Sequence, residues 1–246
     1  MEKPKSLYHY TSIDVMCKLF TNIQDDLFIF HASSTETMND GAEYEFVREQ
    51  CSDESTEIIM EKELGIPFAL CFSESGECVP MWTMYANKGN GVCLKFNFDK
   101  LGEYFKELKK GDNRSMSFSK CMYKPINANK KKKPFSVSDT YPDIDQLKKN
   151  MIETSFIKPK CFSYEQEWRL MVWQDWLPNK KNNIAFKVRQ DILCPYIEIP
   201  VSINSLEEII IKPDAPTQLI NATQLLRTNY GGLSIPVNPA SITLKV

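Results

Sequence analysis

The sequence predicts an α+β domain built on a mixed, mostly antiparallel and possibly split sheet. Strand-like runs recur along the 246 residues without the regular strand–helix alternation that a doubly wound parallel sheet requires. No internal repeat of about 20–50 residues is present, which argues against a solenoid or a propeller. Hydrophobic residues make up 42% of the chain, enough for one sizeable core, so we expect a single domain over residues 1–246.

In the first part of the chain, short apolar runs alternate with amphipathic segments. Ser12 is placed to cap the first helix, and Asp40 and Glu43 have the spacing of a capping box before another. Pro67 to Ser73 is a continuous apolar run, short enough for a buried central strand. The expected strands span 7–10, 26–30, 67–73 and 91–96, and the expected helices span 13–20, 44–50, 55–64, 81–85 and 99–109.

The second part of the chain contains more strands than helices. An edge strand is expected at 117–123, and the polar, proline-bearing stretch 124–143 is typical of a loop. The expected helices span 144–157 and 217–228, and the expected strands span 168–173, 185–188, 196–201, 208–211, 234–237 and 242–246.

The charge and hydropathy patterns exclude several classes of protein. Thirty basic and 32 acidic side chains nearly balance, so the whole molecule has no strong field for nucleic acid or anionic lipid. The apolar runs are far shorter than the ~20 residues that cross a bilayer, so we expect no membrane partner. The start, MEKPKSLYHY, lacks the apolar core of a secretory signal, and we therefore expect a cytoplasmic protein.

Motifs of the common cofactor-binding folds are missing. The eight cysteines lack the paired spacing of a zinc site, so we interpret them as reduced, small apolar residues and expect no metal. The sequence has no Gly-x-Gly-x-x-Gly, no Walker lysine and no Gly-x-Ser-x-Gly. These absences argue against Rossmann enzymes, P-loop enzymes and α/β-hydrolases.

His9 is the first candidate for a functional side chain. On a strand it points to the face opposite its neighbours Tyr8 and Tyr10. A neutral imidazole both donates and accepts hydrogen bonds, which suits it to a ribose hydroxyl or an amide. A hydrogen-bonded structural histidine is the alternative.

The end of the predicted central strand supplies a second group. Ser73 stands where that strand ends, and polar residues at such positions often border a ligand site. Trp82 and Tyr85 follow and offer rings for stacking. The alternatives are a routine turn residue for Ser73 and core packing for the two aromatic rings.

Two acidic residues enter a later strand. Glu165 and Glu167 would share one face there, and two like charges on one face repel each other and raise a pKa, which is typical of a site. Arg169 shares that face, so a structural Arg–Glu pair at the sheet surface is an equal alternative.

Two further groups have simpler explanations. Helix capping explains Asn39, Asp40 and Glu43 well, and a functional role for these residues is the alternative. Lys130, Lys131, Lys132 and Lys133 are typical of a solvated loop, although the same run could form a patch for a phosphate-bearing partner or nucleic acid.

Several short blocks together resemble a bacterial domain family of unknown function, number 2971. The order and approximate spacing match over nearly the whole chain, and the Trp-x-x-Tyr-Ala and Glu-Trp-Arg blocks are the most specific. The blocks are Leu7 to Tyr10, Met38 to Asp40 with Glu43, Cys71 to Glu74, Met81 to Ala86, Gly91 to Cys93 and Tyr164 to Leu170.

A weaker resemblance, to the ADP-ribosyltransferase superfamily, rests on the series His, Ser with Tyr, and Glu-x-Glu on successive strands. It implies a split antiparallel sheet that binds NAD as substrate. It further implies that Glu167 is the catalytic carboxylate and that Glu165 assists the acceptor. The cofactor-binding candidates are His9, Tyr10, Ser73, Trp82, Tyr85 and Arg169, with Trp82 or Tyr85 stacking on nicotinamide.

These observations lead to two alternative functions. The first is an ADP-ribosyltransferase-like enzyme that cleaves the nicotinamide–ribose bond and transfers ADP-ribose to a macromolecule or to water, with a toxin or phage-defence role implied by resemblance. The second is a non-catalytic module that binds a ligand or another protein. The residues leave the acceptor open.

Overall fold

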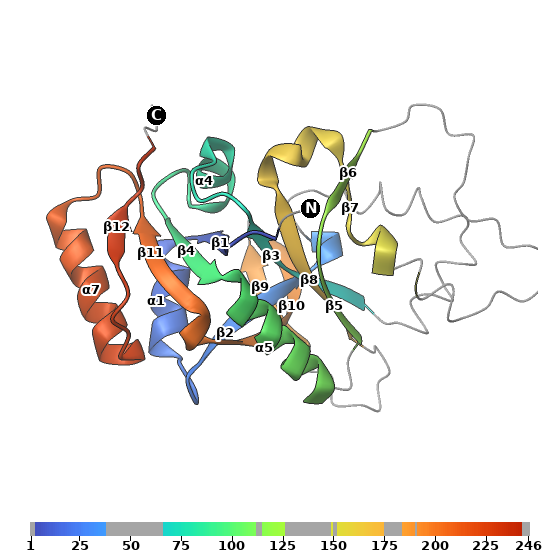
Figure 1. Ribbon diagram of the computed structural model, residues 1–246, viewed down its shortest axis with the longest axis horizontal. Helices are drawn as coiled ribbons and strands as arrows, with labels where there is room; N and C mark the ends of the chain where they lie inside the picture. Colours follow the sequence, from blue (N-terminus) through green and yellow to red (C-terminus); the bar gives the residue numbers. More distant parts are fainter. Residues whose placement is uncertain are drawn as a thin grey trace, which may run out of the picture.

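The computed structural model describes residues 3–37, 66–111, 115–125, 149, 152–174, 184–189 and 191–242. Figure 1 shows the arrangement of the strands and helices within these ranges. The strands are β1 (Ser6–Thr11), β2 (Leu27–Ser34), β3 (Ile66–Ser73), β4 (Val92–Asn97), β5 (Ser115–Lys120), β6 (Met122–Lys124), β7 (Ile157–Pro159), β8 (Glu167–Gln174), β9 (Ile184–Arg189), β10 (Ile192–Ser202), β11 (Leu206–Ile211) and β12 (Val237–Pro239). The α-helices are α1 (Ile13–Thr21), α4 (Val79–Tyr85), α5 (Phe98–Gly111) and α7 (Thr217–Gly231), and the 3-10 helices are η1 (Thr35–Thr37), η2 (Lys160–Glu165) and η3 (Ile203–Ser205).

Ten of the strands in the described ranges form one sheet, in which β3 is the branching strand. One edge of β3 pairs along its whole length with β8, which also pairs with β5. The other edge pairs with β2 at Phe68 and Ala69 and with β1 at Ser73. The sheet therefore divides into the branches β1-β4-β11-β12 and β2-β10-β9. Every pairing in it is antiparallel except β11 with β12, which confirms the predicted mixed, mostly antiparallel sheet of an α+β fold.

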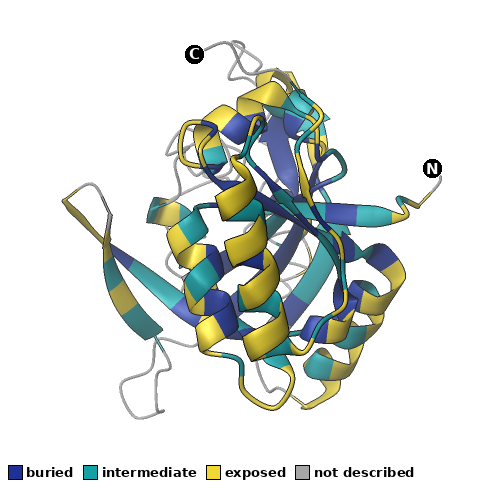
Figure 2. Cartoon of the chain, turned by 90° about the vertical axis from the view of Figure 1, so that its left-hand side faces the viewer, coloured by how far each residue is buried: buried dark blue, intermediate teal, exposed yellow. Residues whose placement is uncertain are grey.

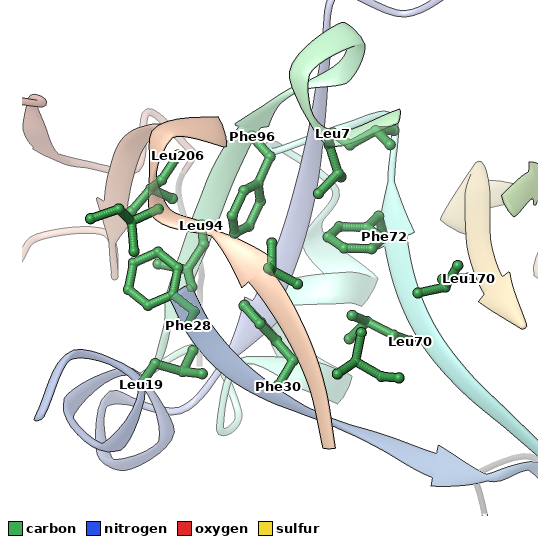
Figure 3. Packing of buried hydrophobic residues seen from close by; sticks show 14 of the residues in the cluster. Leu7, Leu19, Phe28, Phe30, Leu70, Phe72, Leu94, Phe96, Leu170 and Leu206 are labelled. Atoms are coloured by element: carbon green, nitrogen blue, oxygen red, sulfur yellow. The ribbon is translucent and has the colours of Figure 1, made fainter. Parts of the chain in front are cut away.

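The main core lies on one face of this sheet, where α1, α5 and α7 cover it. Figure 3 shows aromatic and leucine side chains from several strands meeting there. Phe30 lies between the rings of Phe28 and Phe96, at centroid distances of 6.3 and 6.0 Å. Figure 2 shows helices whose outward residues are exposed while their inward residues are buried, as an amphipathic pattern requires.

Local signals in the sequence account for the ends of several elements. The Ser12 hydroxyl accepts a hydrogen bond from the Val15 N–H at 3.1 Å, which confirms the predicted cap of α1. After α4 the chain turns through positive φ angles at Asn87, Lys88 and Gly89. Gly91 begins the return to β4, and a Cβ there would lie 2.8 Å from the Ala86 carbonyl. The predicted strand–helix–turn–strand unit around α4 is therefore confirmed.

The region from β5 to β7 differs from the prediction. The expected edge strand 117–123 is divided, because the buried Cys121 lies between β5 and β6 and donates its N–H to the Glu167 carbonyl at 2.8 Å. β6 then pairs with β7 in a separate, parallel, two-stranded sheet. The expected helix 144–157 was predicted too long, since Ile157 belongs to β7. Pro159 disfavours a helical conformation at Lys158, the residue before it.

Some predicted features fall outside the described residues. They include Asn39, Asp40 and Glu43 with the helices expected at 44–50 and 55–64, and the lysine run Lys130 to Lys133. The strand expected at 234–237 is placed later, at Val237–Pro239, where it pairs in parallel with β11.

Candidate functional site: a buried charge cluster at the start of β8

Three strands bring polar side chains together on the face of the sheet opposite the main core. Ser73 at the end of β3 lies directly opposite Tyr8 of β1 on one side and Glu167 of β8 on the other. Residues that face each other across antiparallel strands project to the same face. Arg169, two residues along β8, shares that face and lies opposite Cys71.

The chain enters β8 through a sharp bend at Gln166, which separates Glu165 at the end of η2 from Glu167 at the start of β8. η2 ends at Glu165, and Gln166 has a left-handed backbone with φ 45° and ψ 50°. The carbonyl of Gln166 accepts a hydrogen bond from the Glu74 N–H, which ties this bend to the end of β3. Glu165 and Glu167 are therefore not successive residues of one strand face, yet their carboxylates converge.

Four charged side chains form the cluster: Lys158, Glu165, Glu167 and Arg169. The Lys158 ammonium bonds to the Glu165 carboxylate and lies 2.9 Å from Glu167 Oε2. Arg169 donates two hydrogen bonds to the same Glu167 carboxylate, from Nε to Oε1 at 2.6 Å and from Nη2 to Oε2 at 3.0 Å. The side chains are between 2 and 4% exposed, so two cations and two carboxylates balance each other out of water.

The two carboxylates of this cluster differ in electrostatic environment. Burial alone would raise the pKa of Glu167, but the charges of Arg169 and Lys158 outweigh it and lower the pKa to about 2. Burial also raises the pKa of Glu165, and the contact with Lys158 offsets this only in part, so that pKa stays above its ordinary value. One carboxylate is thus held ionised, while the other binds a proton more readily.

Hydroxyl groups join the cluster to the rest of the site. The Tyr85 hydroxyl on α4 donates to Glu165 Oε1 at 3.1 Å, and the Ser73 hydroxyl donates to the Glu165 carbonyl at 2.6 Å. The Tyr123 hydroxyl on β6 accepts the Glu167 N–H at 2.7 Å. The structure therefore brings Ser73, Tyr85, Glu165, Glu167 and Arg169 together, from three blocks that are far apart in the sequence.

Trp82 and Tyr10 lie on the same side of the sheet but are engaged in packing. Trp82 is fully buried, and its indole N–H donates to the Gly76 carbonyl at 2.9 Å. The Tyr10 ring meets it edge to face, with centroids 5.5 Å apart, and the Tyr10 hydroxyl donates to the Ser75 carbonyl. Both rings therefore belong to a small apolar cluster between α4 and β1.

His9 lies on the opposite face from Glu167. It pairs with the buried Leu94 across β1 and β4, and its ring packs edge to face on Phe30 at 5.1 Å in the main core. Its Nδ1 lies 2.9 Å from the Cys71 carbonyl oxygen, and burial lowers the pKa of the imidazole. The predicted alternation with Tyr8 and Tyr10 is confirmed, and for that reason the structure does not bring His9 to the cluster.

Sequence reasoning missed Lys158 and Tyr123. Both belong to the small β6–β7 sheet, where they are paired directly. Lys158 carries no sequence signal of burial, because a lysine beside a proline is typical of an exposed loop. Only the unbalanced carboxylates of the Glu-x-Glu block could have pointed to a second buried cation.

The described residues contain neither a metal-binding group nor a membrane-spanning helix. There, no group of three or more His, Cys, Asp or Glu side chains is arranged to hold a metal ion. None of the helices within the described ranges is long and apolar enough to cross a membrane.

Comparisons with known proteins add two likenesses. In its fold the chain is similar to DarT of Thermus sp. 2.9, in a structure with ADP-ribosylated ssDNA (TM-score 0.39, 9% identity, 97% of this chain and 95% of that one). A structure of the same DarT with NAD+ gives a TM-score of 0.38 at 10% identity, over 97% and 96% of the two chains. No curated protein sequence matches the chain. Residues 81–170 match the sequence model of the family described as protein of unknown function (DUF2971), so the resemblance to that family is confirmed over this part of the chain.

Proposed function

We propose that this protein binds NAD and cleaves its nicotinamide–ribose bond, in the manner of an ADP-ribosyltransferase. The observation that carries the proposal is the pair of carboxylates that share Lys158 but have pKa values moved in opposite directions. Pairs of acidic groups separated in this way are typical of sites that need one charged carboxylate and one proton acceptor.

Glu167 is the carboxylate that stabilises the positive charge developing on the ribose. When the C–N bond to nicotinamide breaks, its electron pair leaves with nicotinamide and the ribose takes on oxocarbenium character. A carboxylate that stays ionised and is held by two bonds from Arg169 supports such a transition state without reorganising.

Glu165 is the general base that takes a proton from the acceptor. Water or an acceptor hydroxyl attacks the ribose carbon, forms the new C–O bond and gives up its proton. Glu165 takes that proton, since its raised pKa is closer to neutrality than that of Glu167. The half-buried Tyr85 orients this carboxylate through its hydroxyl.

One observation favours a second candidate, the non-catalytic binding module. Glu167 is fully ion-paired, and both glutamates are almost completely buried, as a purely structural network would be. The position of His9 on the other face agrees with this alternative, because a ribose contact from His9 would have to come from the cluster side.

A titration with NAD+ combined with an assay of nicotinamide release separates the two candidates. Wild type should bind NAD+ and release nicotinamide with water, protein or single-stranded DNA as acceptor. In Glu167→Gln release should fall by about 10²-fold or more, while NAD+ binding changes much less. Glu208→Gln is the matched control, since Glu208 also pairs with a lysine, Lys95, but away from the cluster.

Two results would decide against the enzyme. If the protein binds NAD+ but releases no nicotinamide with any acceptor, the non-catalytic binding module is favoured. If it neither binds NAD+ nor releases nicotinamide, NAD is not its ligand. Equal release by wild type and a folded Glu167→Gln would remove Glu167 from the mechanism.

A further inference from the structure

Lys158 occupies an unusual place in the fold. It is the middle residue of β7, in the two-stranded sheet, whereas both of its carboxylate partners belong to the segment that enters the main sheet. It is only 2% exposed and ranks among the largest fully buried side chains in the described residues. A buried lysine is costly unless its charge is compensated, so its environment must supply that compensation.

Two carboxylates and an aromatic ring surround its ammonium group. Lys158 bonds to Glu165 and Glu167, and its Nζ lies 5.0 Å from the centre of the Phe162 ring. Glu167 has a second cation in Arg169. For Glu165, Lys158 is the one cation in contact within the described part of the chain.

This asymmetry decides what happens when the ammonium is removed. Of the described cations in contact with the two buried carboxylates, Arg169 would be the one that remains. Two like charges that share a buried site do not both stay ionised. Glu165, which contacts no other cation in the described part of the chain, would then take up a proton.

We propose that Lys158 is the positioning residue of this site, whose ammonium holds Glu165 beside Glu167 with both carboxylates ionised. The part of this inference that concerns turnover rests on the proposed function, in which Glu165 must be ionised to accept a proton. The part that concerns charge and position rests on the contacts alone.

Within the ranges that the structure describes, several elements packed against the cluster place titratable or charged groups around Lys158. They are Glu165 of η2, Glu167 and Arg169 of β8, Tyr85 of α4, Tyr123 of β6, Cys71 of β3 and Cys121 between β5 and β6. Burial raises the pKa of both thiols, so neither supplies a negative charge near neutral pH. Among these described groups, the charge balance therefore lies between the two glutamates and the two cations.

The test is the substitution Lys158→Met, which keeps a long side chain and removes the charge. Infrared difference spectroscopy between pH 5 and pH 8, without NAD, should show a protonated carboxyl group that persists to higher pH than in wild type, by about one pH unit or more. Lys95→Met is the matched control, because it breaks the partly exposed pair with Glu208 and should leave this signal as in wild type. A Lys158→Met spectrum that matches wild type would overturn the inference.

A second variant keeps the test decisive if Lys158→Met does not fold. Lys158→Met with Glu165→Gln removes one charge of each sign, so it should fold and show no additional protonated carboxyl. If the double variant also fails to fold, the loss comes from packing and the inference is wrong.

Turnover supplies a readout that a merely structural lysine would not move. In Lys158→Met the acid limb of nicotinamide release should shift to higher pH with the infrared signal, and unchanged limbs would contradict the role in positioning. If wild type releases no nicotinamide at all, the proposed function fails while the infrared result still decides the role of Lys158.

Discussion

Replacing Glu167 by glutamine should change how the stability of the protein depends on pH. Burial acts to raise the pKa of Glu167, but Arg169 and Lys158 lower it from 4.5 to about 2. A group whose pKa is lower in the folded than in the unfolded state stabilises the fold above its unfolded pKa. That stabilisation is lost as the pH falls through the folded pKa.

The size of this effect follows from the separation of the two pKa values. Each pKa unit corresponds to about 1.4 kcal/mol, so the ionised Glu167 contributes about 3 kcal/mol to the free energy of unfolding at pH 7. About 1 kcal/mol of that contribution remains at pH 3, when the group is still largely ionised in the folded state. The Glu167→Gln variant lacks this pH-dependent contribution to the unfolding free energy, because glutamine does not ionise.

Urea unfolding at pH 7 and at pH 3 measures the difference. The gap in unfolding free energy between wild type and Glu167→Gln should narrow by about 2 kcal/mol at the lower pH. Glu165→Gln is the control. Because the folded-state pKa of Glu165 is raised, its contribution to the free energy of unfolding is complete at low pH and is lost as the pH rises. The difference in unfolding free energy between wild type and Glu165→Gln should therefore not narrow at pH 3. Parallel pH profiles for wild type and Glu167→Gln would refute the assigned charge state.

Three other positions test the packing and the contacts around the cluster. Gly91→Ala should lower the unfolding free energy by about 1–3 kcal/mol in urea titrations, because its Cβ would clash with the Thr11 carbonyl oxygen and lie 2.8 Å from the Ala86 carbonyl. Unchanged stability would contradict this tight packing of the turn. Trp82→Ala should cost about 3–5 kcal/mol, since it empties a fully buried site, and a loss below 1 kcal/mol would show that the site collapses or is not packed. Tyr85→Phe removes a hydrogen bond that lowers the pKa of Glu165, so the acid limb of nicotinamide release should move to higher pH, whereas an unmoved limb would separate Tyr85 from that carboxylate.

Much of the fold could be predicted because its signals are local. The cap at Ser12 and the turn from Asn87 to Gly91 depend on a few adjacent residues, and the structure has both as expected. The apolar run that forms β3 pairs with three other strands, as its continuous hydrophobicity indicates for a central strand.

The partners within the site were harder to predict because they depend on chain topology. An Arg–Glu pair at the sheet surface was one of two equal alternatives, because Arg169 and the glutamates are close in sequence and share a strand face. The structure has Arg169 paired with Glu167, but the pair is buried. Lys158 was not expected there, since only the separate β6–β7 sheet carries it to the glutamates. The alternation at His9 was predicted, but which face would hold the cluster depended on the register of β1 with β3 and β4, which no local pattern reveals.

Cleavage of NAD+ can be measured as nicotinamide release in a single turnover, with enzyme in excess over NAD+, because this assay detects cleavage whatever the acceptor. Wild type should release nicotinamide, and Glu167→Gln should lose about 10²-fold or more of this activity. Glu165→Gln should show a loss of comparable size, because Glu165 acts as the general base. Thermal melts confirm that each variant is folded. If folded wild type releases no nicotinamide with water, protein or single-stranded DNA present, the protein does not cleave the nicotinamide–ribose bond and the proposed function is wrong.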